Sequence, residues 1–137
     1  MALKNINPTT TNAWKQLDTH FDTIKNSHLK EFFKNDTHRP TNFSIAFDDF
    51  KVDFSKNRIT KETIKLLIEL ANEVDLKDAI NKYFSGDQIN ATEKRAVLHT
   101  ALRANNKDSI IINGVNIQSE IKKTLNQIET FTTDIVS

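Results

Sequence analysis

Four histidines are the side chains of this sequence best suited to transfer a proton near neutral pH or to bind a metal ion. They are His20, His28, His38 and His99. No two of them have the His-x-x-x-His spacing that places two imidazoles on one face of a helix. The chain also contains no cysteine, which excludes thiolate nucleophiles, disulfides and cysteine metal sites. We therefore expect no metal ion and no other cofactor on these residues.

One histidine lies in a basic pattern. Arg95, His99 and Arg103 are four residues apart, so on a helix they would share one face. Such a face could contact a phosphate or a carboxylate through charge-assisted hydrogen bonds. The pattern favours a structural face that hydrogen-bonds another part of the protein over a ligand site.

Two further groups have residue types used in catalysis. Asp48 and Asp49 are adjacent carboxylates, but neighbours in a strand or tight turn point in different directions, which suits a turn better than an acid and base pair. Ser85 could be a nucleophile, yet Gly86 and Asp87 after it are typical of a helix end, and no base stands at a fixed relation to it. We therefore predict no catalytic residue in this chain.

Composition argues against several classes of binding protein. The chain has only two glycines and no GxGxxG or GxxxxGK[ST] pattern, so no glycine-rich phosphate cradle is expected. Its 19 basic and 18 acidic residues are interspersed, without the basic stripe of a nucleic-acid binder. A group of aromatic side chains could stack on bases, but without basic neighbours it favours a buried core. This group is Phe43, Phe47, Phe50 and Phe54.

Apolar spacing in the first half of the chain predicts helices and one hairpin. A helix should begin near Asn7-Pro8-Thr9, and Pro40 should mark a break after a second apolar group at 29–33. Alternating residues then predict a hairpin over 43–54 with an aromatic face. Thr60 is the expected N-cap of a helix with Glu62 in its first turn. Its predicted buried stripe is Ile64, Leu67, Ile68, Ala71 and Val74.

The second half is predicted in the same way. Asp75 should cap a helix that ends at Gly86. Asn90 followed by Glu93 resembles a capping box and predicts a helix through Leu102. Asn113-Gly114 between two apolar triplets predicts a hairpin with a type I′ turn. Ser119 is the expected cap of a last helix, whose apolar residues are Ile121, Leu125, Ile128, Phe131 and Ile135.

These elements predict one mainly helical α+β segment with two short β-hairpins and no linker or repeat. No apolar stretch is long enough for a signal peptide or a membrane span, so we expect a cytoplasmic location. The last helix reaches Ser137 without a stop signal, and we therefore expect the chain to be part of a longer one.

Several stretches resemble the glucose-6-phosphate isomerase family, in its bacterial form. Residues 89–103 match the pattern "IN-x-TE-x-RAVLH-x-ALR", which is long and unusual in composition. The similarity follows the whole chain in order. Its other stretches are Asn5-Ile6-Asn7-Pro8-Thr9 with Ala13-Trp14, Phe47-Asp48-Asp49, and residues 52–60 and 84–88.

The resemblance implies that residues 1–137 are an amino-terminal segment that precedes two α/β sugar-isomerase (SIS) domains. The family interconverts glucose 6-phosphate and fructose 6-phosphate through a cis-enediol, without a metal, in glycolysis and gluconeogenesis. Its phosphate loop and catalytic residues lie beyond the region matched here, which agrees with the absence of a predicted site. Members are dimers, so a homodimer is expected of the intact protein.

Within that family the segment would have a supporting role, with Arg95, His99 and Arg103 as contacts behind the active site. The alternative is a stand-alone helical module that binds a protein partner and catalyses nothing. Its apolar stripes would then have to close a core by themselves.

Overall fold

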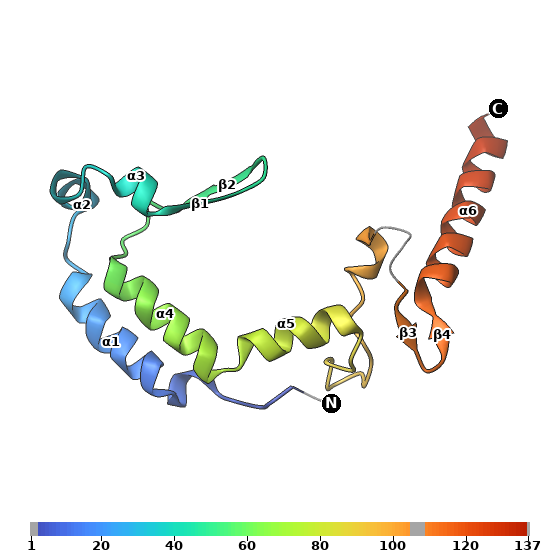
Figure 1. Cartoon of the computed structure of the whole chain (residues 1–137), viewed down its shortest axis with the longest axis horizontal. Helices are drawn as coiled ribbons and strands as arrows, with labels where there is room; N and C mark the ends of the chain where they lie inside the picture. Colours follow the sequence, from blue (N-terminus) through green and yellow to red (C-terminus); the bar gives the residue numbers. More distant parts are fainter. Residues whose placement is uncertain (1–2, 105–108, 137) are drawn as a thin grey trace. The chain divides into compact units, whose positions relative to one another are not determined.

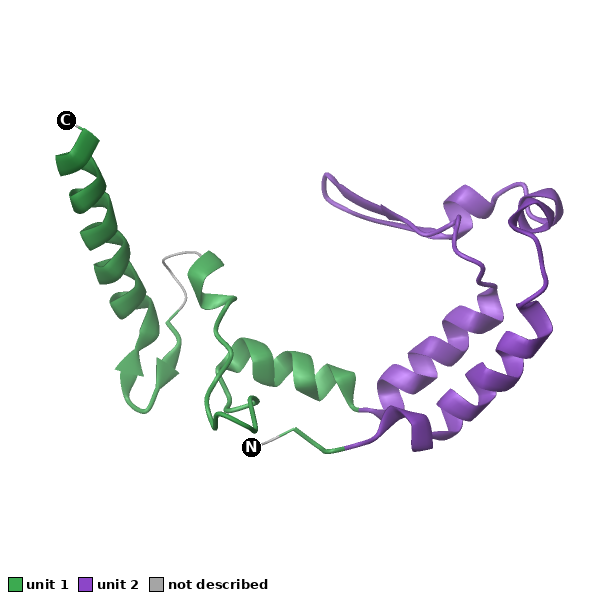
Figure 2. Cartoon of the chain, turned by 180° about the vertical axis from the view of Figure 1, so that it is seen from behind, with its two compact units in different colours: residues 1–5, 75–137 green, residues 6–74 purple. Residues whose placement is uncertain are grey.

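The computed structural model describes residues 3–104 and 109–136, which form two compact units (Figures 1 and 2). Unit 2 covers Ile6–Val74, and unit 1 joins residues 1–5 to residues 75–137. Unit 2 contains the 3-10 helix η1 (Pro8–Thr10), α1 (Asn12–Ile24), α2 (Leu29–Asn35), α3 (Arg39–Asn42), β1 (Ser44–Phe47), β2 (Phe50–Asp53) and α4 (Lys61–Glu73). Unit 1 contains α5 (Leu76–Ser85), η2 (Ala101–Arg103), β3 (Ile111–Ile112), β4 (Val115–Asn116) and α6 (Ile117–Val136).

Both sheets are antiparallel hairpins, β1 with β2 and β3 with β4. The predicted class, mainly helical α+β with two short hairpins, is thereby confirmed. In the part of the chain that the structure describes, no helix combines the length and apolarity needed to cross a bilayer.

Local signals determine where helices α1 and α4 of unit 2 begin. Thr60 caps α4 as predicted: its hydroxyl accepts the Thr63 N–H at 3.3 Å, and the Thr63 hydroxyl accepts the Thr60 N–H at 2.9 Å. This reciprocal pair is a capping box with Thr in place of the usual Glu. Helix α1 begins later than predicted, because Pro8 starts the short η1 and Thr11 then caps α1 by accepting the Trp14 N–H.

Glu73, at the end of α4, forms a second cap on α1. Its two carboxylate oxygens accept the Asn12 N–H at 2.9 Å and the Ala13 N–H at 3.0 Å. A negative charge at the positive end of a helix is stabilising, and these two amides have no partner within the helix.

We expect Glu73→Gln to lower the free energy of unfolding by about 1 kcal/mol, because one amide oxygen replaces two carboxylate oxygens and the charge is lost. Urea denaturation followed by circular dichroism measures the change. Glu69→Gln is the matched control on the same helix, where only a 3.9 Å ion pair with Lys65 is lost. Equal effects of the two substitutions would contradict the capping role.

The face of α4 that packs against α1 differs from the predicted stripe. Thr63 and Leu66 are buried, whereas Leu67 and Ile68 of the predicted stripe are exposed. The bonds of α1 to Thr63 and Glu73 turn α4 so that these residues face its partner. Apolar periodicity gave the helix correctly, but specific polar contacts selected a neighbouring face.

The first hairpin forms as predicted, but its aromatic face is not buried as predicted. Phe47 pairs with Phe50 across a turn in which Asp48 has a φ of 53°. Phe43 is buried and meets Phe54 edge to face at 6.0 Å. Phe47 and Phe50 are 81% and 67% exposed, so the expectation that all four phenylalanines form a core is wrong. The strands stand away from the helices of unit 2 (Figure 1), and their apolar residues remain exposed to solvent.

Arg39 is the centre of the core beside this hairpin, although sequence analysis did not single it out. Its side chain is 2% exposed, and its guanidinium lies over the rings of Phe32, Phe33 and Phe43, at 4.2 Å from the last. Nε and Nη2 donate to three backbone carbonyls in the loop after β2. Pro40 lies in the first turn of α3 and thus starts a helix instead of only breaking one.

In unit 1, two predicted turns are confirmed. Gly86 caps the C-terminus of α5 with a φ of 80°, and Asn113 and Gly114 have φ values of 50° and 78°, as a type I′ turn requires. The predicted cap of the last helix is wrong: α6 begins at Ile117, two residues before Ser119. The Asn116 side chain accepts the Gln118 N–H at 3.1 Å and takes that role.

The predicted helix after Asn90 does not form. Residues 91–94 are a turn, Lys94 has a φ of 52°, and Asn90 and Arg95 exchange backbone hydrogen bonds across it. The Asn90 side chain accepts the Glu93 N–H at 3.1 Å, as in a helix cap. An Asn side chain can stabilise such a turn equally well without a helix, and here the chain folds back.

Candidate functional site

The histidines lie in separate places. His28 caps α2 by accepting the Lys30 N–H at 3.1 Å, and His38 precedes α3. His99 is exposed in a turn, and its carbonyl accepts a hydrogen bond from Arg103. Within residues 3–104 and 109–136, no three His, Cys, Asp or Glu side chains come together as metal ligands.

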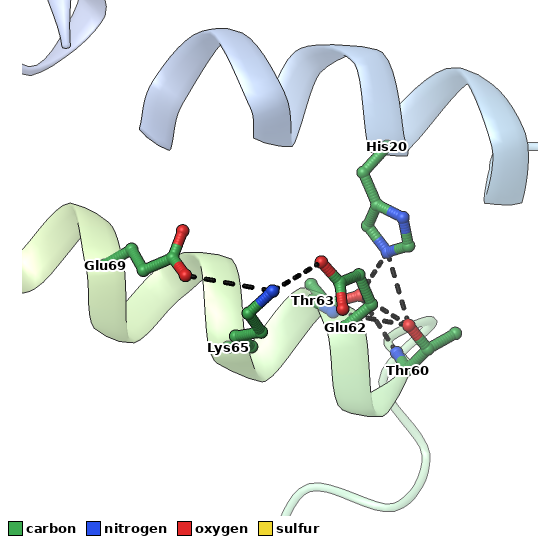
Figure 3. A network of polar contacts seen from close by, with 6 residues as sticks. All are labelled: His20, Thr60, Glu62, Thr63, Lys65 and Glu69. Carbon is green, nitrogen blue, oxygen red and sulfur yellow. Dashed lines mark hydrogen bonds and ion pairs between the residues drawn. The ribbon is translucent and has the colours of Figure 1, made fainter. Parts of the chain in front are cut away.

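His20 lies in a polar network between α1 and the start of α4 (Figure 3). Its Nε2 is 2.7 Å from the Thr63 hydroxyl and 3.3 Å from the Thr60 hydroxyl. Both threonines belong to the capping box of α4. The Nε2 atom of His20, on α1, therefore contacts both hydroxyls of the capping box at the start of α4.

Beside this network runs an open groove of about 390 Å³ between α1 and α4. It is lined by Lys15, Gln16, Thr19, His20, Thr23, Glu62 and Leu66. Glu62 also pairs with Lys65 at 3.5 Å, and Lys65 reaches Glu69 at 3.9 Å (Figure 3). Because the His20 Nε2 is engaged by hydroxyls, the arrangement serves to hold the two helices together rather than to present a free base to the groove.

We expect Thr63→Val to lower the free energy of unfolding by about 1 to 2 kcal/mol. The valine keeps the shape of the side chain but loses its bonds to His20 and to the Thr60 N–H. Thr23→Val is the control, because that hydroxyl only binds the His20 carbonyl on an exposed face of α1. Urea unfolding of both variants tests the difference, and no excess loss in Thr63→Val would refute it.

The basic pattern of Arg95, His99 and Arg103 does not form one helical face. Arg95 lies in the turn bridge and pairs with the Glu93 carboxylate, whereas Arg103 belongs to η2. Arg103 Nη1 donates to the His99 carbonyl at 3.3 Å. The spacing argument fails because it required a continuous helix through these residues.

The remaining candidates occupy turns and helix ends. Asp48 and Asp49 form the turn of the first hairpin. The Ser85 hydroxyl donates to the Asp87 carboxylate at 2.9 Å and to the Lys82 carbonyl at 3.2 Å, at the end of α5. The Ser85 hydroxyl is therefore hydrogen-bonded to groups at the end of its own helix.

Asp53, at the end of β2, has a perturbed pKa. Hydrogen bonds from the Ser55 side chain and then from its backbone N–H, the latter at 2.8 Å, lower the pKa of the Asp53 carboxyl. Ser55 itself is buried, and its carbonyl accepts a hydrogen bond from Arg39. The ionised carboxylate thus holds the loop that supplies carbonyls to the arginine.

This shift predicts a pH dependence of stability. The folded pKa lies below the unfolded one, so the contribution of Asp53 is present above its usual pKa and is lost as the pH falls through the folded pKa. We expect Asp53→Asn to lose less stability than the parent between pH 6 and about pH 2.5. Urea midpoints at several pH values test this. Parallel pH curves for the two proteins would be the contrary result.

Comparison with known proteins identifies the family. The family described as phosphoglucose isomerase matches residues 53–137. A glucose-6-phosphate isomerase of Christiangramia forsetii is 52% identical over 134 residues, which are 98% of this chain and 25% of the relative. One from Wigglesworthia glossinidia brevipalpis is 52% identical over 135 residues, with the same coverage. The chain thus spans about a quarter of the length of these relatives. The match to the family over residues 53–137, with this identity along nearly the whole chain, shows that the protein belongs to the phosphoglucose isomerase family.

Proposed function

We infer that this chain is an amino-terminal, structural part of an enzyme that interconverts glucose 6-phosphate and fructose 6-phosphate. The observation that carries the proposal is the 52% identity to glucose-6-phosphate isomerases along 98% of the chain. In this proposal the two SIS domains, with the acid and base groups that move the proton through a cis-enediol, lie outside these 137 residues. The enzyme would need no cofactor.

Unburied apolar residues support a role as part of a larger protein. On α6 four apolar residues repeat at helical spacing, and each is more than half exposed. They are Leu125, Ile128, Phe131 and Ile135. A stand-alone module would be expected to bury such a stripe in its own core, since apolar area removed from water is the main favourable term in folding.

The proposal extends to location and assembly. A glycolytic and gluconeogenic enzyme with sugar phosphates as substrates would act in the cytoplasm, and it would form a homodimer. Size-exclusion chromatography with light scattering of the protein translated from the whole reading frame tests the dimer. A monomer at micromolar concentration would contradict this part.

The main experiment is a chimera. The 134 matched positions of the Christiangramia forsetii enzyme are replaced by this chain, and fructose 6-phosphate is converted in an assay coupled to glucose 6-phosphate oxidation. We expect the chimera to keep its kcat/KM within about tenfold of the parent, because the catalytic groups are unchanged and the segment only supports them.

Two controls test whether the enzyme needs this segment or only tolerates its replacement. A truncated enzyme that lacks these positions should lose activity or stability, and a chimera carrying Arg39→Met should be less thermostable than the unmodified chimera. If the unmodified chimera folds but is inactive, the segment cannot replace its relative and the proposal fails. The non-catalytic interaction module would then be the better explanation.

A further inference from the structure

Helices α1 and α4 form a two-helix layer in unit 2, and the helices run antiparallel. The start of α1 contacts the end of α4 through Asn12 and Glu73, and its second half contacts the start of α4 through His20 and Thr63. Figures 1 and 3 show the two ribbons side by side. The contact positions are therefore known on both helices.

On both helices, an exposed apolar residue comes directly after a contact position in the sequence. Trp14 follows the buried Ala13, and Phe21 follows His20; on α4, Leu67 follows the buried Leu66. One residue along a helix is a rotation of about 100°, in the same sense on every right-handed helix. Because α1 and α4 are antiparallel, these equal rotations bring all three side chains to the same side of the layer.

This apolar side consists of Trp14, Phe21, Leu67 and, at its outer edge, Ile68, which are between 42% and 57% exposed. The opposite side of the layer carries polar residues, which lie one residue before a contact position or three residues after one. Both spacings rotate the side chain away from the apolar side. They are Gln16, Thr23, Glu62 and Glu69. Gln16, Thr23 and Glu62 line the open groove, and Glu69 pairs with Lys65, as suits a surface in water.

We propose that the apolar side of the α1–α4 layer is covered by the part of the polypeptide outside these 137 residues, while the polar side faces solvent. The inference rests on the proposed function, in which the chain is about a quarter of an isomerase. The relatives supply the occupant, because three quarters of their length lies outside the matched region.

A second copy of the chain fits this surface less well. Half-exposed, the four side chains offer about 300 Å² of apolar surface, whereas a stable dimer takes roughly 800 Å² from each partner. A covalently linked domain needs less contact area, since linkage raises the effective concentration of the two surfaces. The small size of the apolar side therefore favours packing within one polypeptide.

Cysteine labelling tests the proposal on the protein translated from the whole reading frame. The 137 residues contain no cysteine, so Leu67→Cys and Glu69→Cys each place one thiol in this segment, on opposite sides of one helix. In this structure Leu67 is 44% exposed, and Glu69 exposes 42% of its side chain. Each native labelling rate with a maleimide is divided by the rate of the same variant in urea, and labelled peptides are identified by mass spectrometry.

We expect the normalised rate of Leu67→Cys to be at least about tenfold below that of Glu69→Cys, independent of protein concentration. Equal rates would overturn the proposal, because both sides would then be open to water. Protection that disappears on dilution would also overturn it, in favour of a second copy. Isomerase activity of the unsubstituted protein is measured separately, so a failure of the proposed function is distinguished from a failure of the docking surface.

Discussion

Replacing Arg39 by methionine should lower the free energy of unfolding by about 3 to 5 kcal/mol, the largest effect that we expect from a single substitution. The side chain is buried, and no ion pair of the described residues includes it. Its charge is instead stabilised by carbonyl dipoles: Nε donates to Ser55 at 2.7 Å, and Nη2 to Asn57 at 2.8 Å and Ile59 at 2.9 Å.

Methionine would keep much of the volume but would remove the Arg39 donors from the Ser55 and Ile59 carbonyls and leave the Asn57 carbonyl with only the Ile59 N–H. It would also lose the attraction between the guanidinium and the faces of the surrounding phenylalanine rings. Arg39→Lys should recover part of the loss, because an ammonium keeps the charge but cannot reproduce the planar fork of donors. We therefore expect the order of stability to be arginine, lysine, methionine.

Arg58→Met is the control for this series. Arg58 Nη1 also donates to a backbone carbonyl, that of Lys25 at 2.8 Å, but on an exposed residue. Its loss should cost no more than about 1 kcal/mol. Urea denaturation followed by circular dichroism gives all four values. If Arg39→Met and Arg58→Met were equally costly, the buried arginine would not be the centre of this core.

The second large effect is expected at Gly86. Gly86→Ala should lower the free energy of unfolding by about 2 to 4 kcal/mol, from two sources. The residue has a φ of 80°, which an L side chain rarely adopts. A Cβ there would also lie 2.9 Å from Ile112 Cδ1 and 3.3 Å from its Cγ1, so the Ile112 side chain would have to shift.

Gly114→Ala separates the two sources. Its φ is 78°, almost the same, but a Cβ there would meet nothing within 4 Å. It should cost only the backbone term, about 1 to 2 kcal/mol. The difference between the two variants measures how tightly the end of α5 packs on β3. Equal losses of unfolding free energy in the two variants would show that the Ile112 side chain moves aside at no cost.

Local sequence signals correctly predicted one helix start, one helix end and one turn of this fold. The N-cap at Thr60, the helix end at Gly86 and the hairpin turn at Asn113-Gly114 depend on interactions within four residues, and all three predictions are confirmed. The family pattern in residues 89–103 was also readable directly, and the comparisons confirm the family.

Interactions between distant residues could not be read in this way. The segment after Asn90 contains good helix formers and a cap, yet it folds into a turn and a short 3-10 helix, because intrinsic helix propensity is weak compared with tertiary context. The expected basic face disappeared with that helix. The cap of α6 moved to Asn116 for a simpler reason, since two candidate side chains lie three residues apart and only one can begin the helix.

The sequence by itself thus determined the family, the mixed fold class, the start of α4, the end of α5 and the turn of the second hairpin, because these depend on residue type and local spacing. Only the tertiary structure decided which face of α4 meets α1, that the tip of the first hairpin is exposed, and that Arg39 is buried among rings and carbonyls. The burial of Arg39 and the packing of α4 on α1 depend on partners far along the chain, such as Ser55 for Arg39, 16 residues away, and Glu73 for Ala13, 60 residues away. No periodicity encodes such pairings, because they follow from the packing of elements that the sequence specifies only one at a time.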